Sequence, residues 1–328
     1  MTYKSWFFST LLIIALPLLV VASFNYYIDP LWNFNCNNKY NNKQMPFNER
    51  QQKTNYITFH KFDYDSLILG SSRTTYIKQT DFVGLNAYNY AVNNMLIDEY
   101  YDYIEYAKKV KGSDFDYIII GLDFYASNKN LDKEFAEPAH YIANTNQFGY
   151  RFTSLISRDT LDYAKQNYAA ALEENPINYT YNRENIKSLF KVSEEESVAN
   201  IETTLNTYRT KIYANYEYTN VREMLEKIKN SNPNTRFIIF TTPVNHKLYN
   251  LMLELDLSTH YQQLINDVVE VFGEVYDFNY PNAITTDDRN YFDGSHFYPE
   301  IGTLIAHRIS NLSTELATDF GTLITKVK

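Results

Sequence analysis

Three short apolar runs, each closed by glycine or threonine, constrain the fold of this 328-residue chain more than any other feature. They occupy residues 66–70, 117–121 and 237–241. Runs without polar alternation are typical of strands that are buried on both faces of a parallel sheet. Weaker strand candidates are residues 87–92 and 275–278. Segments with helical periodicity lie between them, at about 98–111, 218–230, 259–272 and 298–312. This β-α-β alternation predicts a doubly wound α/β domain with a mainly parallel, five-stranded sheet.

An uncharged segment at residues 6–24 predicts a transmembrane helix. Nineteen residues at about 1.5 Å each span roughly the 30 Å hydrocarbon core of a bilayer. Lys4 precedes the segment and Asp29 is the first charge after it, so a cytoplasmic stub at 1–5 and an extracytoplasmic globular part are expected. A cleaved secretory signal is an open alternative, because Val20-Val21-Ala22 resembles a cleavage site. A buried core helix is the other alternative.

The rest of the chain divides by composition. Residues 25–60 are rich in Asn and Lys with little periodicity, which predicts a membrane-proximal linker. The α/β domain is then expected at 61–328. Within it, residues 126–215 interrupt the alternation with polar, Tyr-rich sequence, which predicts a helical insertion over one end of the sheet.

Charge and cysteine content exclude several classes of protein. The net charge is −9, with 30 basic and 39 acidic residues and no basic stripe, which argues against nucleic acid or an anionic membrane surface as a partner. Cys36 is the only cysteine, so the sequence predicts no intrachain disulfide, zinc site or iron–sulfur site. No metal or organic cofactor is expected.

A pair of hydroxyl residues follows the first predicted strand, in Leu69-Gly70-Ser71-Ser72-Arg73-Thr74. Ligands bind at this end of the strands in open α/β sheets. Ser72 is expected at the start of the following helix, where backbone N–H groups and the helix dipole stabilise an oxyanion. An ordinary helix N-cap is the structural alternative. A phosphate-binding loop would need spaced glycines and a lysine, and a nucleophile elbow would need glycine at position 74.

A second polar motif lies near the C-terminus, in Phe292-Asp293-Gly294-Ser295-His296-Phe297-Tyr298-Pro299. Pro299 suits the first turn of a helix, so Asp293 and His296 are expected in the preceding loop. An Asp three residues before a His can fix the tautomer that the His needs to act as a base. The alternative is a solvated turn with an incidental histidine.

The chain order Ser72, Asp293, His296 resembles the SGNH (GDSL-like) hydrolase family, particularly its membrane-anchored branch linked to acylation of bacterial surface polysaccharide and teichoic acid. The resemblance covers about residues 64–312 and implies a flavodoxin-like fold. It implies that Ser72 is the nucleophile, His296 the general base and Asp293 the residue that orients it.

The other blocks of that family match with substitutions. The first block corresponds to Gly70-Ser71-Ser72, the second to residues 89–94 and the third to Gly121-Leu122-Asp123. Ala91 replaces the second-block glycine but keeps an N–H that can donate to an oxyanion. Asp123 replaces an Asn, and an ionised carboxylate cannot donate to an oxyanion. Asn93 or Asn94 is therefore expected to supply that donor, or the site is weak.

The resemblance implies serine-dependent O-acyl transfer or ester hydrolysis, with O-acetyl the favoured group, on a cell-surface or exported glycan. The backbone N–H groups of Ser72 and Ala91 are expected to hold the oxyanion. Candidate substrate contacts are Arg73, Asp123 and His246. An anchor at 6–24 favours a transferase fed by a membrane-bound, acyl-exporting partner. The alternative is a non-catalytic subunit that binds or assembles a glycan.

Overall fold

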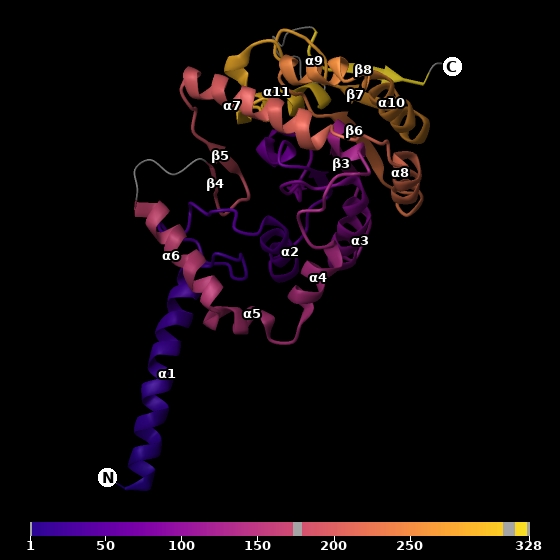
Figure 1. Ribbon diagram of the computed structural model, residues 1–328. Helices are drawn as coiled ribbons and strands as arrows, with labels where there is room; N and C mark the ends of the chain where they lie inside the picture. The colour runs from indigo at the N-terminus through magenta and orange to yellow at the C-terminus, as the bar shows by residue number, and fades with distance from the viewer. Residues whose placement is uncertain (1, 173–178, 311–318, 327–328) are drawn as a thin grey trace. The chain divides into compact units, whose positions relative to one another are not determined.

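The central sheet is built from residues 63–138 and 187–328, which form one compact unit, called here the sheet unit. Residues 1–62 and 139–186 form a second, the helical unit. The computed structural model describes residues 2–172, 179–310 and 319–326 (Figure 1).

The sheet has six strands within the described residues, in the order β2-β1-β3-β6-β7-β8. Their bounds are Ser66–Gly70 for β1, Ala87–Asn89 for β2, Tyr117–Leu122 for β3, Arg236–Thr241 for β6, Glu274–Asp277 for β7 and Thr322–Thr325 for β8. The first five in this order are parallel, which confirms the predicted α/β class with a mainly parallel sheet. Successive strands are added on one side of β1 and then on the other, so the strand order reverses between β1 and β3. Ligands bind at this point in doubly wound folds.

The predicted count of five strands was one too low. β8 pairs with β7 in the antiparallel direction, with Val275 opposite Ile324. It is a short edge strand, Thr-Leu-Ile-Thr, and its side chains are mostly exposed. The sequence therefore lacks the apolar run by which the buried strands were recognised.

Helices cover both faces of the sheet. Ile68, Ile119 and Phe240 pack in one cluster with residues of α11 (Pro299–Ile309). The other face is covered by α3 (Tyr100–Lys111), α8 (Val221–Asn230) and α10 (Ser258–Phe272), of which α8 contacts both others (Figure 1). These are the four predicted helices; residues 311 and 312 of the last prediction lie outside the described residues. The unit also contains α7 (Glu194–Thr207), α9 (His246–Glu254) and the short strand β5 (Lys187–Leu189).

The helical unit begins with α1 (Tyr3–Ile28), which is long and apolar enough to cross a membrane. The other elements of this unit are α2 (Glu49–Phe59), α4 (Pro138–Asn146), α5 (Tyr150–Thr153), the 3-10 helix η5 (Ser154–Ile156), α6 (Arg158–Leu172) and β4 (Tyr179–Tyr181). The region 126–215 is thus rich in helix, as predicted, but it is divided: 139–186 belong to the helical unit and α7 to the sheet unit.

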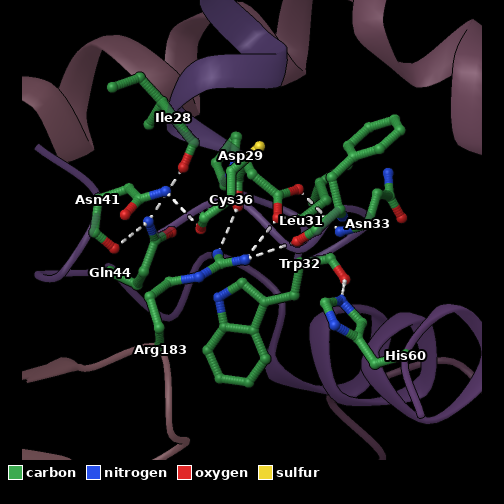
Figure 2. A network of polar contacts seen from close by, with 12 residues as sticks. Ile28, Asp29, Leu31, Trp32, Asn33, Cys36, Asn41, Gln44, His60 and Arg183 are labelled. Carbon is green, nitrogen blue, oxygen red and sulfur yellow. Dashed lines mark hydrogen bonds and ion pairs between the residues drawn. The ribbon is translucent and has the colours of Figure 1, made fainter. Parts of the chain in front are cut away.

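Residues 25–60 form defined structure, where the sequence predicts a linker. They contain α2 and a network of polar contacts, drawn in Figure 2. Asp29 ends α1 and its carboxylate accepts from Arg183 Nη2 at 2.6 Å and from the Asn33 N–H at 2.8 Å. The amide of Gln44 donates to the Ile28 carbonyl at 3.1 Å. Asn and Gln side chains here satisfy carbonyls left free at the helix end, so an Asn-rich sequence without periodicity is still fixed in place.

Candidate active site

Gly70 ends β1 in a conformation that only glycine adopts easily. Its φ is +150°, and a Cβ at this position would lie 2.2 Å from Thr74 Oγ1 and 2.9 Å from the Gly121 carbonyl oxygen. The backbone therefore turns tightly between β1 and β3, and it carries Ser72 past the carboxyl end of the strand.

The segment after Ser72 differs from the prediction. A single 3-10 turn, η1 (Thr74–Tyr76), follows in place of an α-helix. Asn89 Nδ2 donates to the carbonyls of Thr74 at 3.0 Å and Ile77 at 2.9 Å, which an α-helix would use for its own ladder. The prediction that a helix dipole acts on Ser72 was therefore wrong, because a three-residue turn has almost no macrodipole.

The loop that carries Asp293 and His296 is a closed hairpin. An antiparallel bridge joins Tyr291 to Phe297 at its base. Within it, Asp293 Oδ1 accepts the backbone N–H groups of Ser295 at 2.7 Å and His296 at 2.8 Å. These bonds form a local Asp-turn and fix the carboxylate in place. As predicted, α11 begins at Pro299, after this loop.

Ser72, His296 and Asp293 lie in one hydrogen-bonded chain. Ser72 Oγ is 2.8 Å from His296 Nε2, although the two residues are 224 positions apart. His296 Nδ1 is 2.8 Å from Asp293 Oδ2 and 2.9 Å from the Ser295 hydroxyl. With the ring proton donated from Nδ1 to Asp293, Nε2 can accept the proton of Ser72. The His296 side chain is 24% exposed, so its ring is in contact with solvent.

The Asp293 carboxylate is held in its ionised form. Burial raises its pKa, but the His296 ring and the N–H groups of Ser295 and His296 outweigh this effect and leave the pKa below the ordinary 3.8. The negative charge therefore remains beside His296 at neutral pH and favours a proton on Nδ1.

Arg73 and Asp123 form a buried ion pair behind Ser72. Arg73 Nη1 is 2.9 Å from Asp123 Oδ1, and the Thr242 hydroxyl donates to the same oxygen. Arg73 Nη2 donates to the Tyr208 hydroxyl at 2.7 Å. Burial alone would lower the pKa of Arg73, but Tyr208 and Asp123 raise it further than burial lowers it. The two residues are 3% and 0% exposed, so both charges are shielded from solvent, and their contact with substrate stays a prediction. The Asp123 charge is compensated by Arg73.

The expected oxyanion donors are only partly available. The Ala91 N–H donates to the side chain of Asn89 at 3.0 Å, which corrects the prediction that it faces an oxyanion. Asn94 has a left-handed φ of 48°, and its amide donates to Glu134 at 2.5 Å. Asn93 is exposed. The Ser72 N–H donates to no group among the residues that the structure describes.

His246 is the first residue of α9 and is not joined to this chain of contacts. Its backbone N–H donates to the Thr285 carbonyl at 2.9 Å, and its ring Nδ1 lies 3.3 Å from the same oxygen. In the described part of the chain, none of its hydrogen bonds reaches Ser72 or His296. A role in substrate contact stays a prediction.

Three supporting residues escaped the sequence analysis: Asn89, Tyr208 and Thr242. Thr242 follows β6 directly, so the rule that ligands bind at the carboxyl ends of parallel strands, which selected Ser72, could have selected it as well. Tyr208 begins a π-helical turn, Tyr208–Ile212, directly after α7. Such turns are frequent at functional sites, but no sequence pattern distinguished this tyrosine among the 31 of the chain.

The described residues contain no group of three or more His, Cys, Asp or Glu side chains that could hold a metal ion. No protein-family model matches this chain, and no curated protein matches it. The interpretation of the site therefore rests on its geometry: a serine hydroxyl, an imidazole and an ionised carboxylate in hydrogen-bonded sequence.

Proposed function

We propose that the protein is a serine-dependent O-acyltransferase or esterase that acts on acyl esters, with acetyl the favoured group, of a bacterial surface or exported glycan. The observation that carries this proposal is the contact of Ser72 Oγ with His296 Nε2 at 2.8 Å, continued by the contact of His296 Nδ1 with Asp293 Oδ2 at 2.8 Å. Residues acting in this order can activate a hydroxyl group for attack on an acyl carbonyl.

The proposed reaction has two steps. Ser72 Oγ attacks the acyl carbonyl while His296 Nε2 takes its proton, and the ester C–O bond then breaks as His296 returns that proton to the leaving alcohol. The acyl group is now on Ser72. Water or a sugar hydroxyl attacks it, transferring a proton to His296, and the released Ser72 regains a proton. The Ser72 N–H is the available backbone donor toward the oxyanion in both steps.

The resemblance to SGNH hydrolases supports the same assignment. The order Ser72, Asp293, His296 matches that family, and the five parallel strands follow the flavodoxin-like order. In our proposal α1 is an uncleaved anchor, with the globular part outside the cytoplasm. That placement favours acyl transfer from a membrane-bound partner over hydrolysis by water.

A fluorophosphonate probe tests the proposal, because it labels serines that are activated by a base. The full chain in detergent should be labelled at Ser72, and Ser72→Ala should remove the label. The matched control is Ser71→Ala. Ser71 is fully buried, and its Oγ accepts from the Arg73 backbone N–H at 3.4 Å. Because the probe cannot reach this hydroxyl, labelling should persist. A label that depends on Ser71 would show that the wrong serine was chosen.

Non-additivity provides a second test, on hydrolysis of an aryl acetate. Ser72→Ala should lower the rate by about 10³-fold or more, and His296→Ala in that background should add almost nothing, because groups that act as a unit are lost together. Independent, multiplying effects would contradict a shared mechanism.

One observation favours a non-catalytic, glycan-binding subunit instead. The Ala91 N–H is occupied by Asn89, so one of the two expected backbone donors to the oxyanion is missing. A folded protein that the probe fails to label would support this second function.

A further inference from the structure

Three large apolar side chains protrude from one short segment of the helical unit. Phe148 is fully exposed, Phe152 is 66% exposed and Ile156 is 53% exposed. Phe148 precedes α5, Phe152 lies in α5 and Ile156 in η5, so the three recur every fourth residue. Single exposed apolar residues are common on protein surfaces, but a group of this size within nine residues indicates a surface that meets another apolar phase.

The segment is tied to the end of α1. Asn25 Nδ2 donates to the Leu155 carbonyl at 2.9 Å, and α1 contacts both η5 and α6. Asn25 is the first residue after the uncharged segment 6–24. Figure 1 shows α5 and α6 beside the C-terminal end of α1. If α1 crosses a bilayer, its apolar segment fills about 28 Å, so Asn25 and Leu155 lie where the hydrocarbon ends.

The neighbouring residues suit a membrane–water interface better than its core. Tyr26 and Tyr27 are 48% and 45% exposed at the same end of α1, and tyrosines are enriched at this depth. Arg158 and Asp159, at the start of α6, are exposed and charged. Charges so close to Ile156 exclude deep insertion but are compatible with the headgroup region.

We propose that Phe148, Phe152 and Ile156 insert into the outer interface of the bilayer that α1 crosses. This contact rests on the anchor in the proposed function and is independent of the Ser72 chemistry. It would give the helical unit a second attachment to the lipid surface and restrict its rotation about α1.

Site-directed spin labels on the full chain test this contact. Cys36→Ser removes the native thiol, and single cysteines are placed at 148, 152 and 156, with references at 13 and 83, in phosphatidylcholine nanodiscs. Ile13 is 72% exposed in the middle of α1, and Val83 is 58% exposed in the sheet unit. Labels at 148, 152 and 156 should favour collision with oxygen over a water-soluble nickel chelate. Their depth should fall between those of 13 and 83.

The two references separate the two ways of failing. If 13 is deep while 148, 152 and 156 match 83, the interfacial contact is wrong and the anchor stands. If 13 is also accessible to the nickel chelate, the anchor fails and the contact proposed here fails with it.

Discussion

Asp293 is the residue whose ionisation the hairpin controls most directly. Because its pKa is lowered below 3.8, the folded protein binds this proton less tightly than the unfolded chain. The ionised carboxylate therefore stabilises the fold above about pH 4, and that contribution is lost as the pH falls through the lowered pKa. We expect the difference in free energy of unfolding between wild type and Asp293→Asn to shrink as the pH falls from 5 toward 3. Urea denaturation at these pH values measures it, and a difference that does not change with pH would contradict the assignment.

The same substitution should change activity in a characteristic way. Asp293→Asn keeps the shape of the side chain but removes the charge that holds the proton on His296 Nδ1, and a loss of about 10⁴-fold is expected by analogy with other triads. Aryl acetate hydrolysis at neutral pH measures this loss. A variant with unchanged rate would show that Asp293 does not orient His296.

Arg73 and Asp123 should matter for stability because both charges are buried. Asp123→Asn removes one partner and leaves the Arg73 guanidinium uncompensated, at a cost of about 3–5 kcal/mol. The matched double variant Arg73→Met, Asp123→Asn removes both charges and should recover most of that loss. Denaturant unfolding of the two variants measures the difference. A double variant as unstable as Asp123→Asn would show that the charges do not act as a pair.

At the scale of elements, α7 supports the hairpin that carries His296. Ser197 Oγ donates to the Tyr291 carbonyl at 2.9 Å and Asn200 Nδ2 to the Phe292 carbonyl at 3.2 Å. A Cβ at Gly294 would lie 3.0 Å from Thr204 Cγ2, so the helix also packs closely on the tip of the loop. The insertion that contains α7 thus helps to place His296 opposite Ser72.

Removing these contacts should loosen the site without unfolding the sheet. We expect Asn200→Ala and Ser197→Ala to cost about 1 kcal/mol each in stability and to lower kcat more than they raise KM, because the position of His296 matters most in the transition state. Thr203→Ala is the control: this exposed hydroxyl donates only within α7, to the Ala199 carbonyl. Steady-state kinetics separate the two outcomes, and equal effects of Thr203→Ala and Asn200→Ala would refute a supporting role for α7.

At the scale of the whole molecule, the proposed anchor at residues 6–24 determines on which side of the membrane the globular part lies. The proposed anchor predicts that a reporter active only outside the cytoplasm works when fused after residue 62, at the end of the first stretch of the helical unit. Intact-mass measurement of the purified protein should show that residues 6–24 are retained. A mature N-terminus near Ser23 would instead identify a cleaved signal. The proposed chemistry at Ser72 does not depend on this result.

The sequence by itself determined the features that depend on local pattern. The runs at residues 67–69, 118–120 and 237–240 are apolar because parallel strands are covered on both faces, and the uncharged segment of α1 is long and apolar enough to cross a membrane. Pro299 marked the start of α11, and the carboxyl end of β1 marked where Ser72 would lie. Such features are set by neighbours in the chain.

Only the tertiary structure decided which of these residues meet. The contact between Ser72 and His296 depends on the packing of α7 and β1 around the hairpin, and the burial of Asp123 depends on Arg73 and Tyr208 from other elements. The sequence predicted a free Ala91 N–H, but in the structure this group donates to the side chain of Asn89. An edge strand such as β8 is recognisable by its pairing with β7, and α2 by the burial of its polar side chains. Apart from the local Asn89–Ala91 bond, these hydrogen bonds and this burial arise between segments distant in the chain, so the pattern of residue types along the sequence does not predict them.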